Sequence, residues 1–173
     1  LIATRIGASR EDCDAAALQS QQRATLAQQE RRFQSIIPIE TSEGLISEDE
    51  CIRTDMTAER LARLPAAFAE LGAAGADQLQ LAKFTDLTSI EHVHTMGNSP
   101  TMCDAGALVL LGDAALGKSL GIAPKARLVT STTASGEPLE VVSGCVTVTE
   151  ALLVDRGLHA RDIDLFEIHE AFA

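Results

Sequence analysis

The sequence predicts an α/β fold made of two regions that differ in their pattern of apolar and polar residues. Residues 14–32 are rich in Ala and Gln and contain neither Gly nor Pro, which favours a long helix near the N-terminus. Beyond residue 102, apolar runs of strand length alternate with short helical segments. The first hundred residues lack this alternation. We therefore expect a mainly helical and irregular region over 1–102 and an α/β region over 103–173.

The first region should begin with a helix over about 9–31. Ser9, with Asp12 three residues later, resembles a capping box in which Asp replaces the usual Glu. FQSIIPIE (33–40) predicts a short edge strand, because Pro38 has no N–H for a ladder. The polar stretch that follows it (41–50) is typical of a turn.

Thr57 should cap the next helix. Four apolar side chains then recur at helical spacing: Leu61, Leu64, Phe68 and Leu71. Pro65 should kink or end that helix. The small residues of LGAAGADQ (71–78) predict a loop, and IEHVHTMGNSP (90–100) predicts an extended segment followed by a turn.

The second region should form a strand–helix–strand–helix–strand segment with parallel or mixed pairing. Three runs are expected as its strands: GALVLLG (106–112), KARLVTSTTAS (125–135) and DIDLFEI (162–168). The continuous apolar run of the first is typical of a strand covered on both faces. A helix closed by Gly121 is expected at 113–121, and another, ending at Gly157, at 146–156.

The charge balance limits the classes of ligand. With 14 basic and 25 acidic residues, the net charge is −11. Such a surface repels nucleic acid and anionic membranes, so an anionic ligand needs a local group of Arg residues. Trp and Tyr are absent, which removes stacking platforms for single-stranded nucleic acid. No apolar run approaches the length of a membrane span.

The sequence predicts no metal site and no redox dithiol. The four cysteines are widely spaced, with no C-x-x-C, and reduced thiols in the cytosol are the expectation, although two disulfides are compatible with the number. His92 and His94 would share one face of a strand, but a zinc site needs at least a third ligand. Cys103 and Cys145 lack a motif that would supply a base.

Two other groups are candidates for a binding or catalytic site. Arg53 and Arg60 flank the start of a predicted helix, and the planar guanidinium is suited to phosphate, although a solvated Arg is the commoner case. His169 and Glu170 follow an expected strand at its C-terminal end, where ligands bind in open α/β sheets. A His there can donate a hydrogen bond or move a proton near neutral pH.

Five stretches in order resemble the thiolase family. They are SREDCDAAALQSQQRA (9–24), ECIRTDMTAERLARLPAAF (50–68), HTMGNSPTMCDAGALVLL (94–111), GIAPKARLV (121–129) and RDIDLFEIHEAFA (161–173). The resemblance implies a partial thiolase-like fold. Residues 1–102 would be the CoA-binding loop domain. Residues 103–173 would be the last strand of the N-terminal half and the first part of the C-terminal half. The chain is expected to be an internal fragment, with the nucleophilic Cys upstream and a Gly-His-Pro loop and a second Cys downstream.

The resemblance implies acyl transfer between acyl-CoA and CoA, by 3-ketoacyl-CoA thiolysis or acetyl-CoA condensation, with CoA as a substrate and no covalently bound cofactor. His169 stands where many thiolases have an Asn that orients a water toward the thioester oxygen. Glu170 and Phe172 would support that loop. The CoA-binding candidates are Arg53, Arg60, Phe68, Ser99 and Pro100. Pro100 replaces a serine that contacts pantetheine, so this contact is lost or moves to Ser99 or Thr101.

The resemblance also implies partners and a compartment. A homodimer or homotetramer is expected, with a β-oxidation hydratase/dehydrogenase subunit as a further partner, because His-Glu-Ala-Phe occurs in thiolases of fatty-acid β-oxidation. The compartment would be the cytoplasm, or the mitochondrion or peroxisome in a eukaryote. The alternatives are a non-catalytic thiolase-like protein that binds CoA or acyl-CoA or acts in assembly, and a lipid-transfer relative that binds fatty chains.

Overall fold

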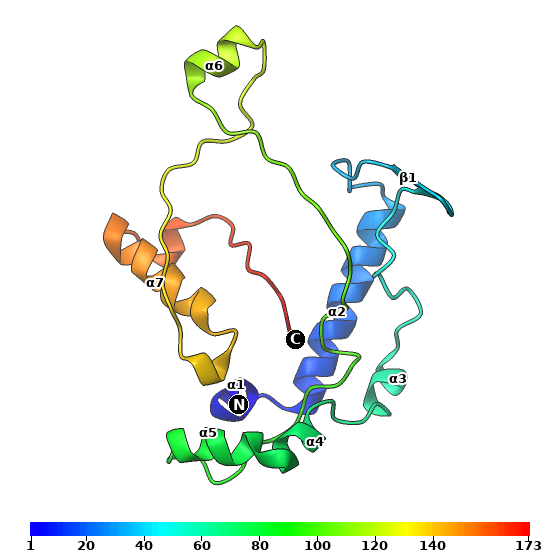
Figure 1. Cartoon of the computed structure of the whole chain (residues 1–173), viewed down its shortest axis with the longest axis vertical. Coiled ribbons are helices and arrows are strands. Elements are labelled where there is room, and N and C mark those ends of the chain that lie inside the picture. Colours follow the sequence, from blue (N-terminus) through cyan, green and yellow to red (C-terminus); the bar gives the residue numbers. More distant parts are fainter. The chain divides into compact units, whose positions relative to one another are not determined.

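The computed structural model describes residues 1–173, and the chain divides into two compact units (Figure 1). The first unit comprises Leu1–Met102 together with His169–Ala173, and the second comprises Cys103–Ile168. Regular structure is mostly helical, and the two strands that form are three residues each. No helix combines the length and the apolar character needed to cross a bilayer.

The first unit contains five helices, one π-helical turn and a hairpin. In chain order they are α1 (Ile2–Ile6), α2 (Arg10–Gln29), β1 (Ile39–Thr41), β2 (Gly44–Ile46), α3 (Ala58–Ala62), α4 (Ala69–Leu71), the π-helical turn (Gly72–Ala76) and α5 (Asp77–Lys83).

The long helix α2 confirms the predicted helix and its cap. The Ser9 hydroxyl accepts a hydrogen bond from the backbone N–H of Asp12 at 3.0 Å, and the Asp12 carboxylate accepts one from the backbone N–H of Ser9 at 3.0 Å. This capping box satisfies two donors that the first turn of a helix otherwise leaves unpaired. The hydrogen bonds from Ser9 also hold the pKa of Asp12 below its ordinary value.

The sequence predicts one edge strand over 33–40 followed by a turn, whereas the structure has a two-stranded hairpin over 39–46. Within 33–40 only Ile39 and Glu40 belong to a strand, and the stretch 41–50 expected as a turn contains β2. β1 and β2 pair antiparallel with Ile39 opposite Ile46. The turn is fixed locally, since the Thr41 hydroxyl donates to the Gly44 carbonyl at 2.8 Å and accepts from the Glu43 N–H at 3.2 Å. Turn geometry therefore sets the register, with Pro38 before the ladder.

The next helix begins as predicted. The Thr57 hydroxyl accepts from the Arg60 N–H at 3.3 Å, and α3 ends at Ala62, before Pro65. The prediction of a loop over 71–78 is wrong. These residues are helical because Ala favours helix, and Gly75, at φ 122°, absorbs the kink between successive turns.

The core of the first unit is small and partly polar. Its buried apolar side chains are Ala3, Cys13, Ala17 and Leu61, and its buried polar side chains are Asp14, Thr95 and Asn98. The extended segment predicted over 90–100 joins this core through an antiparallel bridge between Ala66 and Thr95. Gly97 packs so closely that a Cβ there would clash with the side chains of Leu61 and Leu64.

This close approach predicts that Gly97→Ala destabilises the protein by about 1–3 kcal/mol, the usual cost of overpacking. Urea denaturation would measure the loss. Gly106→Ala is the matched control, because nothing lies within 4 Å of the Cβ that it adds. Equal stability of the two variants would contradict the packing assigned to Gly97.

The second unit contains two helices and two 3₁₀ turns. They are α6 (Ala114–Ser119), Pro138–Glu140, α7 (Gly144–Arg156) and Ala160–Asp162. The Asp113 carboxylate caps α6 by accepting from the Leu116 N–H at 2.7 Å. Gly121 follows α6 at φ 67°, and Gly157 closes α7 at φ 63°. Both predicted helices are confirmed, with α7 beginning two residues earlier than expected.

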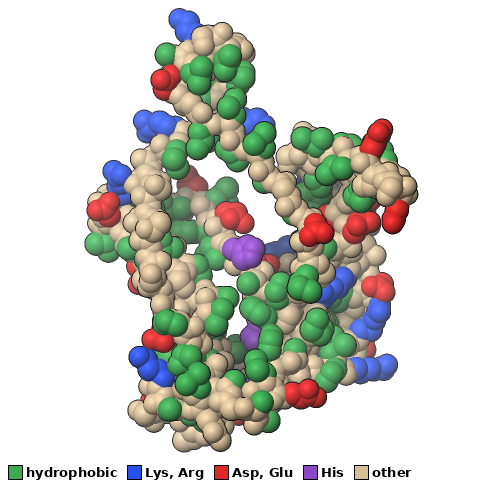
Figure 2. All heavy atoms as spheres, in the orientation of Figure 1, with side chains coloured by type: hydrophobic (Ala, Val, Ile, Leu, Met, Phe, Trp, Pro, Cys, Tyr) green, Lys and Arg blue, Asp and Glu red, His purple; other side chains and the backbone are tan.

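The strands predicted for this unit do not form. None of the runs 106–112, 125–135 and 162–168 belongs to a ladder, so the strand–helix–strand–helix–strand prediction holds for its helices alone. Their apolar side chains face outward, with Leu108 99% and Leu165 89% exposed. Hydrophobic side chains also show on the visible surface of α6 (Figure 2). The physical reason is that a strand is stabilised by hydrogen bonds to a neighbouring strand, and none of these runs is paired with another.

Candidate functional site

A network of hydrogen bonds between charged and polar groups joins α2 to the rest of the first unit. The Arg10 guanidinium donates to Asp14 through Nε at 2.7 Å. Its Nη2 donates to the carbonyls of Leu61 at 2.5 Å and Leu64 at 3.1 Å. The other Asp14 oxygen accepts from the amide of Asn98 at 2.8 Å. The buried carboxylate is therefore paired on both oxygens, as a buried charge must be.

Asn98 also closes its own turn. Its Oδ1 accepts from the backbone N–H of Thr95 at 2.8 Å, and its Nδ2 lies 3.4 Å from the Val93 carbonyl. The Thr95 hydroxyl accepts from the Gly97 N–H at 3.1 Å. One buried side chain thus shapes residues 93–98, hereafter the Asn98 turn, and ties them to α2.

Asn98→Ala should therefore lower the free energy of unfolding by about 1–3 kcal/mol, because it leaves the Thr95 N–H and a carboxylate oxygen buried without partners. Chemical denaturation would measure the loss. Gln28→Ala is the control, since it removes only an exposed bond to Glu48. A cost no larger than that of the control would show that water replaces the lost partners.

Residues 169–173 lie on the first unit at three points. The Ser20 hydroxyl donates to the Glu170 carboxylate at 3.2 Å, and the backbone N–H of Ala173 donates to the Asn98 carbonyl at 3.2 Å. Between these contacts, the Phe172 ring meets Phe68 edge-on at 6.0 Å and His94 at 5.2 Å between centroids. The segment is thereby held against α2 and the Asn98 turn.

His169 stands at the start of this segment with an exposed side chain. Its imidazole makes no hydrogen bond within the chain, whereas its carbonyl accepts from the Ala171 N–H at 3.2 Å. The strand expected before it is not formed, so the structure places His169 by the contacts of its neighbours and not by a sheet edge. Its donor is available to an external group.

The two candidate arginines bond to different partners. The Arg53 guanidinium donates to the carbonyls of Met96 at 3.0 Å and Gly97 at 3.1 Å, and to the Thr101 hydroxyl at 2.5 Å. The exposed guanidinium of Arg60 bonds to the Asp55 carboxylate, which holds the pKa of that carboxyl below its ordinary value. Arg53 thus braces residues on both sides of Asn98, while Arg60 lies in a surface ion pair.

Two polar atoms beside the Asn98 turn are buried without partners. They are Oγ of Ser99 and Nδ1 of His94. Burial lowers the pKa of His94, with a partial offset from the nearby Asn98 side chain, so the ring is neutral at pH 7. Pro100 is exposed and has no N–H to offer. Unsatisfied buried groups are costly, and they cluster at sites of function or of bound water.

The histidine pair does not form a metal site. His92 Nε2 lies 3.0 Å from the carboxylate of Asp77, at the start of α5, whereas His94 packs on Phe172. No three His, Cys, Asp or Glu side chains are grouped so that they could hold a metal ion. The interpretation of these histidines as ordinary hydrogen-bonded residues is right for His92 and incomplete for His94.

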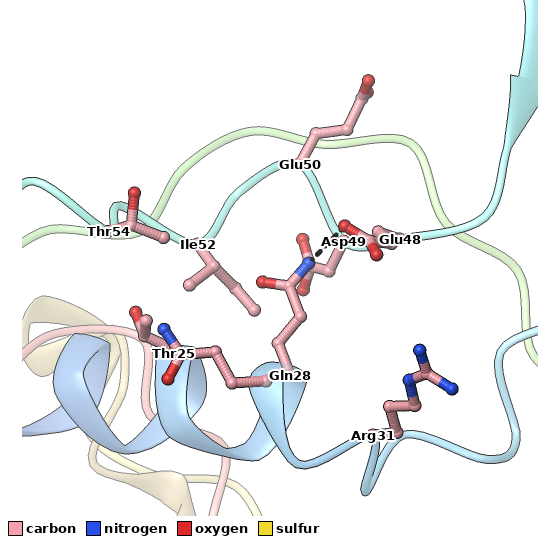
Figure 3. Close-up of a pocket in the computed structure, with 9 residues that line it drawn as sticks. Thr25, Gln28, Arg31, Glu48, Asp49, Glu50, Ile52 and Thr54 are labelled. Atoms are coloured by element: carbon pink, nitrogen blue, oxygen red, sulfur yellow. Dashed lines mark hydrogen bonds between the residues drawn. The ribbon is translucent and has the colours of Figure 1, made fainter.

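One hollow lies away from these residues. It has a volume of about 470 Å³ and lies between the C-terminal end of α2 and residues 48–54 (Figure 3). Gln28 reaches across it to Glu48, with Asp49 and Glu50 beside them. None of the predicted site residues lines it, and its acidic rim would repel an anionic ligand. A smaller hollow of about 140 Å³ includes Arg53 among its lining residues.

Several residues of this arrangement were missed by reasoning from the sequence. Arg10 and Asp14 are four residues apart, a spacing that predicts an ion pair on one helix face. Nothing in the sequence indicates that the pair reaches Asn98. The contact of His94 with Phe172 joins residues far apart in the chain and has no local signal.

The chain matches two family models. The model described as the N-terminal domain of thiolase matches residues 1–86, and that described as the C-terminal domain matches residues 122–173. The 3-oxoadipyl-CoA/3-oxo-5,6-dehydrosuberyl-CoA thiolase of Escherichia coli K12 is 32% identical over 99% of this chain and 39% of its own length. The peroxisomal 3-ketoacyl-CoA thiolase B of Rattus norvegicus is 34% identical over 99% of this chain and 38% of its own length.

Solved structures agree with these matches. Human mitochondrial 3-ketoacyl-CoA thiolase superposes with a TM-score of 0.73 at 27% identity, over 98% of this chain and 39% of that one. Acetyl-CoA acetyltransferase from Syntrophomonas wolfei gives 0.73 at 25% identity, over 99% of this chain and 38% of that one. The chain therefore belongs to the thiolase family and has a partial thiolase-like fold. It spans about 39% of the length of the curated relatives it matches.

Proposed function

We propose that this chain is part of a thiolase that transfers acyl groups between acyl-CoA and CoA, by 3-ketoacyl-CoA thiolysis or acetyl-CoA condensation. Family membership supports the reaction class. The observation that carries the proposal is the placement of residues 169–173, which are held at three points while the imidazole of His169 stays unengaged. A donor without a partner, on a segment held by its neighbouring residues, suits a site where negative charge develops.

His169 is assigned the role of oxyanion donor. When a nucleophile attacks a thioester or ketone carbonyl, the oxygen gains negative charge, and an N–H aimed at that oxygen lowers the barrier. The imidazole N–H of His169 would donate to it directly or through a water. Glu170, bonded to Ser20, and Phe172, packed between two rings, would hold the loop in place.

The nucleophile is assigned to residues outside this sequence. Cys13 is buried, and burial raises the pKa of its thiol, which disfavours the reactive thiolate. Cys103 and Cys145 are exposed, and neither lies in a sequence motif that would supply a base. This chain would therefore supply contacts to CoA and the oxyanion donor, and it needs no covalently bound cofactor.

The CoA contacts are assigned to residues around the Asn98 turn. Phe68, 39% exposed beside Phe172, offers an apolar wall. The contact that Pro100 cannot make is assigned to Ser99 or Thr101; the Ser99 hydroxyl is buried without a partner, and the Thr101 hydroxyl is bonded to Arg53. Arg53 would meet the ligand with its remaining donors or its flat face, and Arg60, exposed on α3, would meet the phosphates.

The domain roles and partners follow from the same proposal. Residues 1–102 would be the CoA-binding loop domain. Residues 103–173 would be the last strand of the N-terminal thiolase half and the first part of the C-terminal half. The three unpaired apolar runs would become strands of those halves. A homodimer or homotetramer, a β-oxidation hydratase/dehydrogenase subunit as partner, and a cytoplasmic, mitochondrial or peroxisomal location belong to this proposal too.

The test of the donor role is His169→Ala in the complete gene product. Thiolysis of a 3-ketoacyl-CoA should show kcat lowered about 10²–10³-fold with KM for CoA little changed, because the donor acts on the transition state. His159→Ala is the control, since His159 is exposed in the second unit. An unchanged kcat would remove His169 from the mechanism.

Arg53→Ala should raise KM for CoA substrates more than it lowers kcat, because it removes a cation and loosens residues 96–101. Steady-state kinetics with varied CoA would measure the two constants, with the exposed Arg63→Ala as the control. A defect in kcat alone would contradict the assignment of Arg53 to CoA binding.

A second candidate function is binding of CoA or acyl-CoA without catalysis. The observation that favours it is Pro100, which has no donor where related enzymes have a serine. CoA binding by a complete gene product that shows no acyl transfer would support this function over the first.

A further inference from the structure

The direction in which the His169 side chain points depends on the neighbouring residues, because the imidazole itself makes no hydrogen bond. Two of the four contacts of its segment come from the Asn98 turn. They are the ring contact of His94 with Phe172 and the hydrogen bond from Ala173 to the Asn98 carbonyl. The turn therefore determines where the end of the segment lies.

The rings that hold Phe172 come from opposite sides of one antiparallel bridge. Ala66 pairs with Thr95, and the backbone N–H of Ala67 donates to the carbonyl of His94 at 2.8 Å. Phe68 and His94 therefore flank the same bridge, Phe68 on one strand-like segment and His94 on the other. Phe172 meets one ring edge-on, with 66° between planes, and the other at a tilt of 51°.

The state of His94 suits an apolar contact. Burial keeps its ring neutral, and Nδ1 is shielded from solvent with no partner. An unpaired buried nitrogen opposes stability, so hydrogen bonding at Nδ1 does not explain the burial of this side chain. Its ring contact with Phe172 does, because aromatic pairs at such separations attract each other.

We propose that His94 is a positioning residue for the His-Glu-Ala-Phe segment. By packing on the ring of Phe172, it helps to set the direction in which the His169 side chain points. The expected effect of His94 on turnover rests on the proposed function. Its expected effect on the position of residues 169–173 rests on the geometry alone. His94 acts at a distance from the reacting atoms, and it is not a catalytic residue.

The test compares three variants of the complete gene product: His94→Ala, His94→Phe and His92→Ala. Hydrogen exchange of a peptide containing residues 169–173 reports the segment directly. His94→Ala should speed this exchange about 2- to 10-fold, the range that one aromatic pair contributes. His94→Phe keeps a ring and should restore protection. His92→Ala, on the same segment but bonded to Asp77, should leave the exchange unchanged.

Turnover gives the second readout. His94→Ala should lower kcat with KM for CoA little changed, and His94→Phe should recover most of the loss. Wild-type exchange in His94→Ala, or equal acceleration in His94→Ala and His92→Ala, would overturn the inference. Normal kcat with accelerated exchange would overturn its catalytic part. A wild-type protein without acyl transfer would overturn the proposed function, and the exchange experiment would still decide whether His94 holds the segment.

Discussion

The bond between Asp14 and Asn98 is the interaction on which the first unit depends. It joins α2 to the Asn98 turn, and through Arg10 it also reaches the carbonyls at the end of α3. With few buried apolar side chains, this unit has little hydrophobic burial to fix its parts. A paired buried carboxylate provides directional bonds where a larger core would provide packing. The same turn then receives Phe172 and Ala173, so the polar network and the proposed oxyanion donor share one support.

Local signals in the sequence predicted α2, α3, α6 and α7, but not α1, α4 and α5. Ser9, Thr57 and Asp113 each cap a helix by accepting the bond that their residue type suggests, and Gly121 and Gly157 each follow one with positive φ. Such signals act within four residues, so the sequence alone contains them. The hairpin over 39–46 was not predicted, because its pairing depends on the turn at Thr41 and Gly44. Residues 71–78 were misjudged because their Ala content outweighs their glycines.

Features that depend on contacts between residues far apart in the chain could not be predicted from the sequence. The apolar runs at 106–112 and 162–168 have the composition of strands, but a strand needs a partner, and composition does not supply one. In the site, the family motifs pointed to His169 and to the residues around Asn98. They did not indicate that Arg53 would bond to Met96 and Gly97. Bonds across such separations arise from tertiary packing alone.

A crystal structure of the complete gene product with a bound acyl-CoA analogue would test the central claim most directly. The claim is that the Asn98 turn places His169 opposite the thioester. The account predicts a His169 nitrogen within hydrogen-bond distance of the thioester oxygen, or joined to it by one water, with Asn98 still bonded to Asp14 and Ala173. A His169 side chain directed away from the analogue, or a segment 169–173 detached from the Asn98 turn, would contradict it.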